Sequence, residues 1–138
     1  MDWITPEVAI GDYLEAQDTA LLKRHGFRSV VSLDGTLTAK HAAEFGLSEV
    51  ASYRFIDGAG NDLRLFRLAI DDLRRLAQLE PPVMVQCHAG RSRSAVVVAA
   101  YLMHSQAIEP EEALAAIAAR REISASPALV ELLHQLEA

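Results

Sequence analysis

The stretch CHAGRSRS, residues Cys87–Ser94, decides the fold of this chain because it separates two apolar runs. Val83–Val85 precede it, and residues 95–103, nearly all apolar, follow it. This pattern predicts a buried strand, a tight loop and a buried helix. A loop that leads into a helix directs several backbone N–H groups at one point, where the helix dipole favours negative charge. The stretch is therefore expected to bind a phosphate group or to stabilise a thiolate.

Three residues of this stretch carry the expected chemistry. Cys87 lies where the strand ends, and a thiolate there can attack phosphorus as a nucleophile. Arg93 begins the buried helix, so it requires an anionic partner, and its planar guanidinium can bind two phosphate oxygens. Gly90 lets the backbone approach a phosphate or adopts a positive φ. A lone cysteine is usually a buried structural residue, so the nucleophile interpretation depends on these neighbours and on Ser94.

The pattern Cys-x5-Arg-Ser at residues 87–94 resembles the phosphate-binding loop of the cysteine-dependent protein tyrosine phosphatases. Ala89-Gly90 in the loop and Ala-Tyr-Leu-Met at residues 100–103 are most similar to the dual-specificity phosphatases. The chain resembles small, single-domain members of prokaryotic type, and the resemblance extends from Ile4 to the last predicted helix.

The resemblance implies an α/β fold with a small, mostly parallel central sheet, helices on both faces, and a core made of strand, phosphate loop and buried helix. It also implies a cysteinyl-phosphate intermediate, with no cofactor and no metal. The family assigns the Ser94 hydroxyl to stabilising the thiolate when it leaves the phosphoenzyme. The residues expected to bind phosphate are His88, Ala89, Gly90, Arg91, Ser92 and Arg93.

Transfer of the phosphoryl group also requires an acid that protonates the leaving oxygen. Asp57 ends a predicted strand and begins a glycine-rich loop. The resemblance implies an acid in such a loop, in a pattern of Asp, about four loop residues, a polar residue and Leu, which residues 57–63 match. Asp-Gly is also a common turn dipeptide. Asp62 is the alternative carboxylate, and we expect it to cap a helix instead.

Two departures from the family pattern affect the site. Gln86 stands where the family usually has a histidine that organises the loop and favours the thiolate. Because glutamine can still form hydrogen bonds, we expect Gln86 to tune the activity and not to abolish it. Ser124–Pro127 replaces a Pro-Asn segment of the family, so one edge of the pocket is expected to differ.

The basic residues other than Arg93 can be interpreted as substrate-binding or as solvent-exposed. His88 and Arg91 either face solvent or recognise an anionic substrate, and in the second case they resemble phosphatases that act on phosphoinositides or phosphatidylglycerophosphate. The arginines of residues 62–79 interleave with aspartates, which predicts a solvated, salt-bridged helix face. These residues are Arg64, Arg67, Asp71, Asp72, Arg74 and Arg75.

Strands alternate with helices along the chain, which predicts an α/β domain whose site lies at the carboxyl end of a central strand. Asp18, Thr38 and Asp62 are expected to cap the first three helices by accepting hydrogen bonds from N–H groups of the first turn. The predicted strands are residues 8–10, 29–33, 52–56 and 83–85. The predicted helices are 19–25, one between Thr38 and Gly46, 62–79, 93–106, and two that begin near 109 and 126. We expect a single domain over residues 1–138.

Composition narrows the class of protein. The 138 residues are 51% hydrophobic and 23% charged, which is typical of a globular domain. A net charge of −6 argues against nucleic-acid binding and against broad contact with anionic membranes. One cysteine allows no internal disulfide and suits a reducing compartment. Without a signal pattern, a membrane-spanning run or clustered histidine ligands, we expect a cytoplasmic monomer without membrane insertion or metal.

These features together predict a metal-independent phosphomonoester hydrolase that acts on a phosphorylated protein or a small phosphomonoester. Phosphotyrosine is the expected substrate, with phosphoserine and phosphothreonine as further options and a phospholipid headgroup as the main alternative. A non-catalytic phosphate-binding module is a second hypothesis, to which the departure at Gln86 would point. Sulfur transfer in a rhodanese-like domain is a third, and the upstream loop at Asp57 argues against it.

Overall fold

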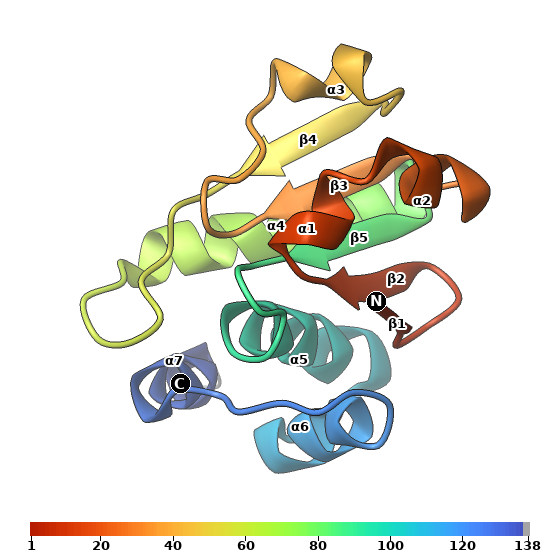
Figure 1. Cartoon of the computed structure of the whole chain (residues 1–138). Coiled ribbons are helices and arrows are strands. Elements are labelled where there is room, and N and C mark those ends of the chain that lie inside the picture. The colour runs from red at the N-terminus through yellow and green to blue at the C-terminus, as the bar shows by residue number, and fades with distance from the viewer. Residues whose placement is uncertain (137–138) are drawn as a thin grey trace.

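The computed structural model describes residues 1–136, which form a five-stranded sheet with helices on both faces (Figure 1). The strands are β1 (Asp2–Trp3), β2 (Val8–Gly11), β3 (Ser29–Ser32), β4 (Glu49–Ser52) and β5 (Val83–Gln86). Their order in the sheet is β1-β2-β5-β3-β4. β5 lies in the centre and pairs in parallel with β2 and β3, β4 pairs in parallel with β3, and β1 pairs antiparallel with β2. The predicted mostly parallel α/β fold is confirmed.

The helices divide into two groups. α4 and α5 pack against one face of the sheet, and α6 and α7 cover the outer side of α5 (Figure 1). Three short helices, α1 to α3, lie over the opposite face. The helices are α1 (Tyr13–Ala16), α2 (Thr19–Arg24), α3 (His41–Glu44), α4 (Leu63–Leu79), α5 (Arg93–Gln106), α6 (Pro110–Ala118) and α7 (Pro127–Leu136).

Side-chain alternation along the strands builds two hydrophobic cores. In β5, Val83 and Val85 face the core beneath α4 and α5, whereas Met84 between them faces the core beneath the short helices. Strands that are buried on both faces have continuous apolar sequences, which explains the Val-Met-Val run. α5 is apolar around nearly its whole circumference because the sheet lies on one side of it and α6 and α7 on the other.

The predicted strand at residues 52–56 is wrong in its bounds, because β4 ends at Ser52. β4 begins earlier than predicted, because Glu49 already pairs with Ser29 of β3. The backbone beyond β4 remains hydrogen-bonded to the segment at the end of β3, since Phe55 N donates to Leu33 O at 2.9 Å. Phe55 is buried as the alternation suggested, and the segment carries the chain to the loop that begins at Asp57.

One prediction for the short helices is wrong, and one short helix was not predicted. Thr38 does not cap α3: the Thr38 backbone N–H instead donates to His41 Nδ1 at 2.9 Å, and the N-cap position is Lys40. α1 was not predicted, although the sequence contains its capping box. The Asp12 side chain accepts from Glu15 N at 2.8 Å, and Asp12 N donates to Glu15 Oε1 at 3.0 Å. The caps predicted for α2 and α4, Asp18 and Asp62, are confirmed.

Two leucines of α4 test how the helix is anchored. Leu73 is fully buried against the sheet, whereas Leu68 on the same helix is 52% exposed. Leu73→Ala should lower the free energy of unfolding by about 2–5 kcal/mol, because it removes buried apolar surface and leaves a cavity. Leu68→Ala should change it by less than about 0.5 kcal/mol. Urea denaturation followed by circular dichroism measures both, and equal losses would show that α4 packs differently.

Candidate active site

Residues 87–92 connect β5 to α5 at the carboxyl edge of the sheet, as the sequence predicts. A pocket of about 300 Å³ opens above this loop. Its lining brings together the predicted nucleophile, arginine and acid from separate segments of the chain. The lining residues are Asp57, Cys87, His88, Ala89, Arg91, Ser92, Arg93 and Ser124.

The backbone of the loop is arranged for an anion. Within residues 1–136, the N–H groups of residues 88–93 donate to no protein acceptor. The carbonyl groups of residues 88–91 are all bound by groups outside the loop. Tyr13 N donates to His88 O at 3.0 Å and Ser124 N to Arg91 O at 2.9 Å, while Arg121 binds the two carbonyls between them. The loop therefore offers a row of donors to a bound anion.

Cys87 is buried at the N-terminal end of α5, where its Sγ accepts a hydrogen bond from Ser94 N at 3.4 Å. A hydrogen bond of this kind and the positive end of a 14-residue helix both stabilise a thiolate. The Ser94 hydroxyl is buried and has no partner among the described residues. It is therefore free to donate to the cysteine sulfur or to a bound oxyanion.

Arg93 joins the phosphate loop to the segment that carries the expected acid. Its Nη1 donates to Phe55 O at 2.9 Å, two residues before Asp57. Its Nε is buried and finds no acceptor in residues 1–136. An unpaired buried guanidinium N–H is unfavourable. A phosphate oxygen in the pocket would satisfy it.

Asp57 is linked to the loop through Ser92, whose hydroxyl donates to Asp57 Oδ1 at 2.5 Å and accepts from Ser126 N at 2.9 Å. The Asn61 side chain closes the acid loop by accepting from Ile56 N at 2.8 Å and donating to Ile56 O at 2.8 Å. Asp62 accepts from Arg64 N at 2.8 Å as the cap of α4. Backbone and side-chain hydrogen bonds from that arginine lower the pKa of Asp62.

Gln86 forms a buried polar network beneath the loop. Its Oε1 accepts from Ser32 Oγ at 2.6 Å, and its Nε2 donates to Asp34 Oδ1 at 2.8 Å and to Thr36 Oγ1 at 3.3 Å. Burial raises the pKa of Asp34, but hydrogen bonds from Gln86 and Thr36 and the charge of Arg93 outweigh burial and lower it. Gln86 thus holds an ionised carboxylate near the loop.

Gly90 is required by the close packing around the loop. Its φ is +67°, and a Cβ there would lie 2.6 Å from Arg121 Nη2 and 2.8 Å from Gly11 O. No other residue type fits both the backbone conformation and this contact. The position is where the loop meets the end of β2.

His88 and Arg91 lie at the rim of the pocket and are exposed. The His88 ring stacks on Tyr13 with 4.4 Å between the ring centroids. Arg91 Nη1 lies 3.8 Å from Glu122 Oε1, a distance at which the exposed pair contributes little to stability.

The family model of the dual specificity phosphatase catalytic domain matches residues 9–138. This match covers the loop at residues 87–92, all seven helices and the strands from β2 onward, whereas β1 precedes it. The chain belongs to the dual-specificity phosphatases.

Three known proteins illustrate the relationship. The chain is 52% identical over 54 residues to the rat phosphatidylglycerophosphatase and protein-tyrosine phosphatase 1, a match that covers 38% of this chain and only 28% of the rat protein. It is 29% identical over 143 residues to human dual specificity protein phosphatase 13B, covering 99% of this chain and 72% of that protein. The crystal structure of the human tyrosine phosphatase-like serine/threonine/tyrosine-interacting protein superposes with a TM-score of 0.82 at 25% identity, covering 99% and 95% of the two chains.

Several residues around this dual-specificity phosphatase loop were not identified from the sequence. Arg121 and Tyr13 bind loop carbonyls, Asp34 accepts from Gln86, and Asn61 closes the acid loop. Asn61 follows a glycine-rich turn, so its role had a local signal. The other three act across long sequence separations and had none.

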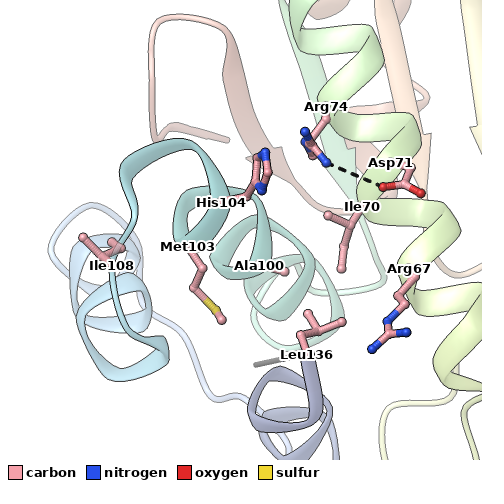
Figure 2. A pocket seen from close by; sticks show the side chains of 9 residues that line it. All are labelled: Arg67, Ile70, Asp71, Arg74, Ala100, Met103, His104, Ile108 and Leu136. Carbon is pink, nitrogen blue, oxygen red and sulfur yellow. Dashed lines mark ion pairs between the residues drawn. The ribbon is translucent and has the colours of Figure 1, made fainter. Parts of the chain in front are cut away.

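A second pocket of about 360 Å³ lies between α4 and α5 and shares no lining residue with the first (Figure 2). Figure 2 shows a rim formed by Arg67, Arg74 and His104 over an apolar floor that includes Ile70 and Ala100.

The predicted salt-bridged face of α4 is confirmed at three arginines, which pair with neighbouring carboxylates. These are Arg64 with Asp62, Arg74 with Asp71, and Arg75 with Glu49 and Asp72. In residues 1–136, no helix combines the length and apolarity needed to cross a membrane.

Gln86→His tests the network beneath the loop. An imidazole next to Asp34 can take up a proton, and its positive charge would favour the Cys87 thiolate. We expect inactivation by iodoacetate to reach its plateau at lower pH in Gln86→His than in the natural chain. Gln86→Met is the control, because methionine can neither carry a charge nor donate a hydrogen bond. Coincident curves for Gln86→His and the natural chain would show that the loop amides and Arg93 alone determine ionisation of the thiol.

Proposed function

We propose that this dual-specificity phosphatase hydrolyses phosphomonoesters through a cysteinyl-phosphate intermediate, without a metal. One observation carries the proposal: a buried thiol, a row of free backbone N–H groups and an unpaired arginine Nε line the same pocket as Asp57. The backbone N–H groups and the arginine Nε each lack an acceptor, which an oxyanion would supply beside the thiol. A phosphate is an anion of suitable charge and geometry for this set.

In the first step, the Cys87 thiolate attacks phosphorus while the bond to the leaving oxygen breaks. The loop amides and Arg93 bind the three remaining phosphate oxygens, whose charge is stabilised in the transition state. Asp57, protonated at this stage, transfers its proton to the leaving oxygen. The products are an alcohol or phenol and a phosphocysteine, with Asp57 left as a carboxylate.

In the second step, a water molecule attacks the phosphocysteine. Asp57 accepts a proton from this water, and the phosphorus–sulfur bond breaks as the new phosphorus–oxygen bond forms. The electron pair returns to Cys87 as a thiolate. Ser94 stabilises that thiolate through its N–H, and its unpaired hydroxyl is available for a second hydrogen bond.

A phosphorylated protein, with phosphotyrosine first, is the proposed substrate. A phospholipid headgroup is the second candidate, because the rim of the pocket carries His88 and Arg91 and because the rat relative's name includes both activities. All groups of the proposed mechanism come from one chain, so we infer that a monomer is active. The required free thiol further suggests a reducing compartment such as the cytoplasm.

Hydrolysis of para-nitrophenyl phosphate in the presence of EDTA tests the reaction class. We expect turnover by the natural chain, and none measurable in Cys87→Ser, which lacks the thiolate but retains the anion site. Orthophosphate binding, measured by calorimetry, should persist in this variant. If the natural chain binds phosphate without turnover, it is a phosphate-binding module. Near-normal turnover in Cys87→Ser would remove Cys87 from the mechanism.

Asp57→Asn tests the acid. For a substrate with a poor leaving group, kcat should fall by about 10²–10⁴-fold, with a smaller loss for an activated aryl phosphate. Because activity requires the protonated acid in the first step, it falls as pH rises, and this basic limb should flatten in the variant. Asp62→Asn is the matched control. It should keep kcat and lose less than about 1 kcal/mol of stability, because asparagine also caps helices and only the interaction of the charge with the helix dipole is lost. Reversed results would assign the acid to Asp62.

A further inference from the structure

The outer side of the phosphate loop is held by one arginine that does not line the pocket. Arg121 follows α6, and its side chain is only 12% exposed. Its Nε donates to Gly90 O at 2.6 Å and its Nη2 to Ala89 O at 3.1 Å. Its Nη1 donates to Asp2 Oδ2 at 2.7 Å, in the N-terminal strand β1.

These contacts fix the direction of two peptide units. In a planar trans peptide, the N–H of one residue points opposite to the carbonyl of the residue before it. When Arg121 holds Ala89 O and Gly90 O outward, the N–H groups of Gly90 and Arg91 must turn the other way. Both N–H groups belong to the row of free donors described above.

The Asp2 carboxylate orients the arginine fork. With Asp2 bound at Nη1, the other two nitrogens are directed at the loop carbonyls. The pair also compensates the charge of Arg121, which is largely buried and would otherwise lack a carboxylate partner. Through Arg121, the interaction connects the first strand of the chain with the loop at residues 87–92.

We propose that Arg121 is a positioning residue of the phosphate loop, and that Asp2 links the N-terminal strand to the geometry of the active site. Arg121 holds two backbone donors toward the bound phosphate and touches neither substrate nor sulfur. The inference rests on the proposed function in one respect, namely that the loop binds a phosphate group.

Three variants of the full chain isolate this role. Arg121→Met removes all donors but retains most of the apolar stem, Arg121→Lys retains the charge without the fork, and Asp2→Asn retains an acceptor without the charge. Arg120→Met is the matched control, because Arg120 is the neighbouring arginine and is exposed. Urea unfolding of each variant establishes the conditions under which all of them are folded.

Under those conditions, we expect Arg121→Met to weaken orthophosphate binding by about tenfold, in line with the energy of one or two hydrogen bonds to an anion. We expect kcat/KM for para-nitrophenyl phosphate to fall by about 10²-fold, mostly in kcat, because donors aimed at phosphate oxygens act most strongly in the transition state. Arg121→Lys and Asp2→Asn should show smaller losses of the same kind. Millimolar methylguanidinium should partly restore kcat in Arg121→Met, which a loss of stability alone would not allow.

The two arms of the experiment separate this inference from the proposed function. Phosphate binding is measured without turnover, so it tests Arg121 even if no substrate is hydrolysed. If Arg121→Met and Arg121→Lys bind orthophosphate within twofold of Arg120→Met, the positioning role is wrong, whatever the activity of the natural chain. If methylguanidinium fails to raise kcat in a folded Arg121→Met that has lost activity, the role is equally excluded.

Discussion

The proposed chemistry of this chain depends on how the backbone of residues 88–91 is held. Tyr13, Arg121 and Ser124 bind all four carbonyl groups from outside the loop, so that the trans peptide units turn their N–H groups the other way. Backbone N–H groups that lack an acceptor beside a buried thiol lose hydrogen-bond energy unless an anion binds to them. In the proposed mechanism this arrangement serves both a thiolate and a phosphate, because each would be an anion at the N-terminus of α5.

The loop is also connected, on two further sides, to parts of the chain that are remote in sequence. Beneath it, the buried Gln86 holds an ionised, partly buried Asp34, whose negative charge offsets part of the positive charge of the site. To one side, Arg93 and Ser92 connect the loop to the segment of Asp57. The proposed nucleophile, anion site and acid therefore belong to one hydrogen-bonded network, so a shift in any of its contacts would change their relative placement.

The main features of the fold were predictable because they depend on local chemistry. Central strands have continuous apolar runs, α4 has an amphipathic pattern with an Asp62 cap, and α5 is apolar throughout. Predictions failed where weak local signals competed with tertiary pairing. β4 begins at Glu49 because its register with β3 places it there, and the Thr38 N–H is taken by His41.

The sequence by itself determined the candidate site residues of this protein and their order: Cys87, Gly90, Arg93 and Ser94 within one short stretch, and Asp57 in a loop upstream. Their spacing carries this information because a strand, a tight loop and a helix N-terminus are formed by adjacent residues. Only the tertiary structure decided what holds the loop in place. Arg121 reaches Gly90 across 31 positions and Asp2 across 119, and contacts over such separations leave no periodic or local pattern in the chain.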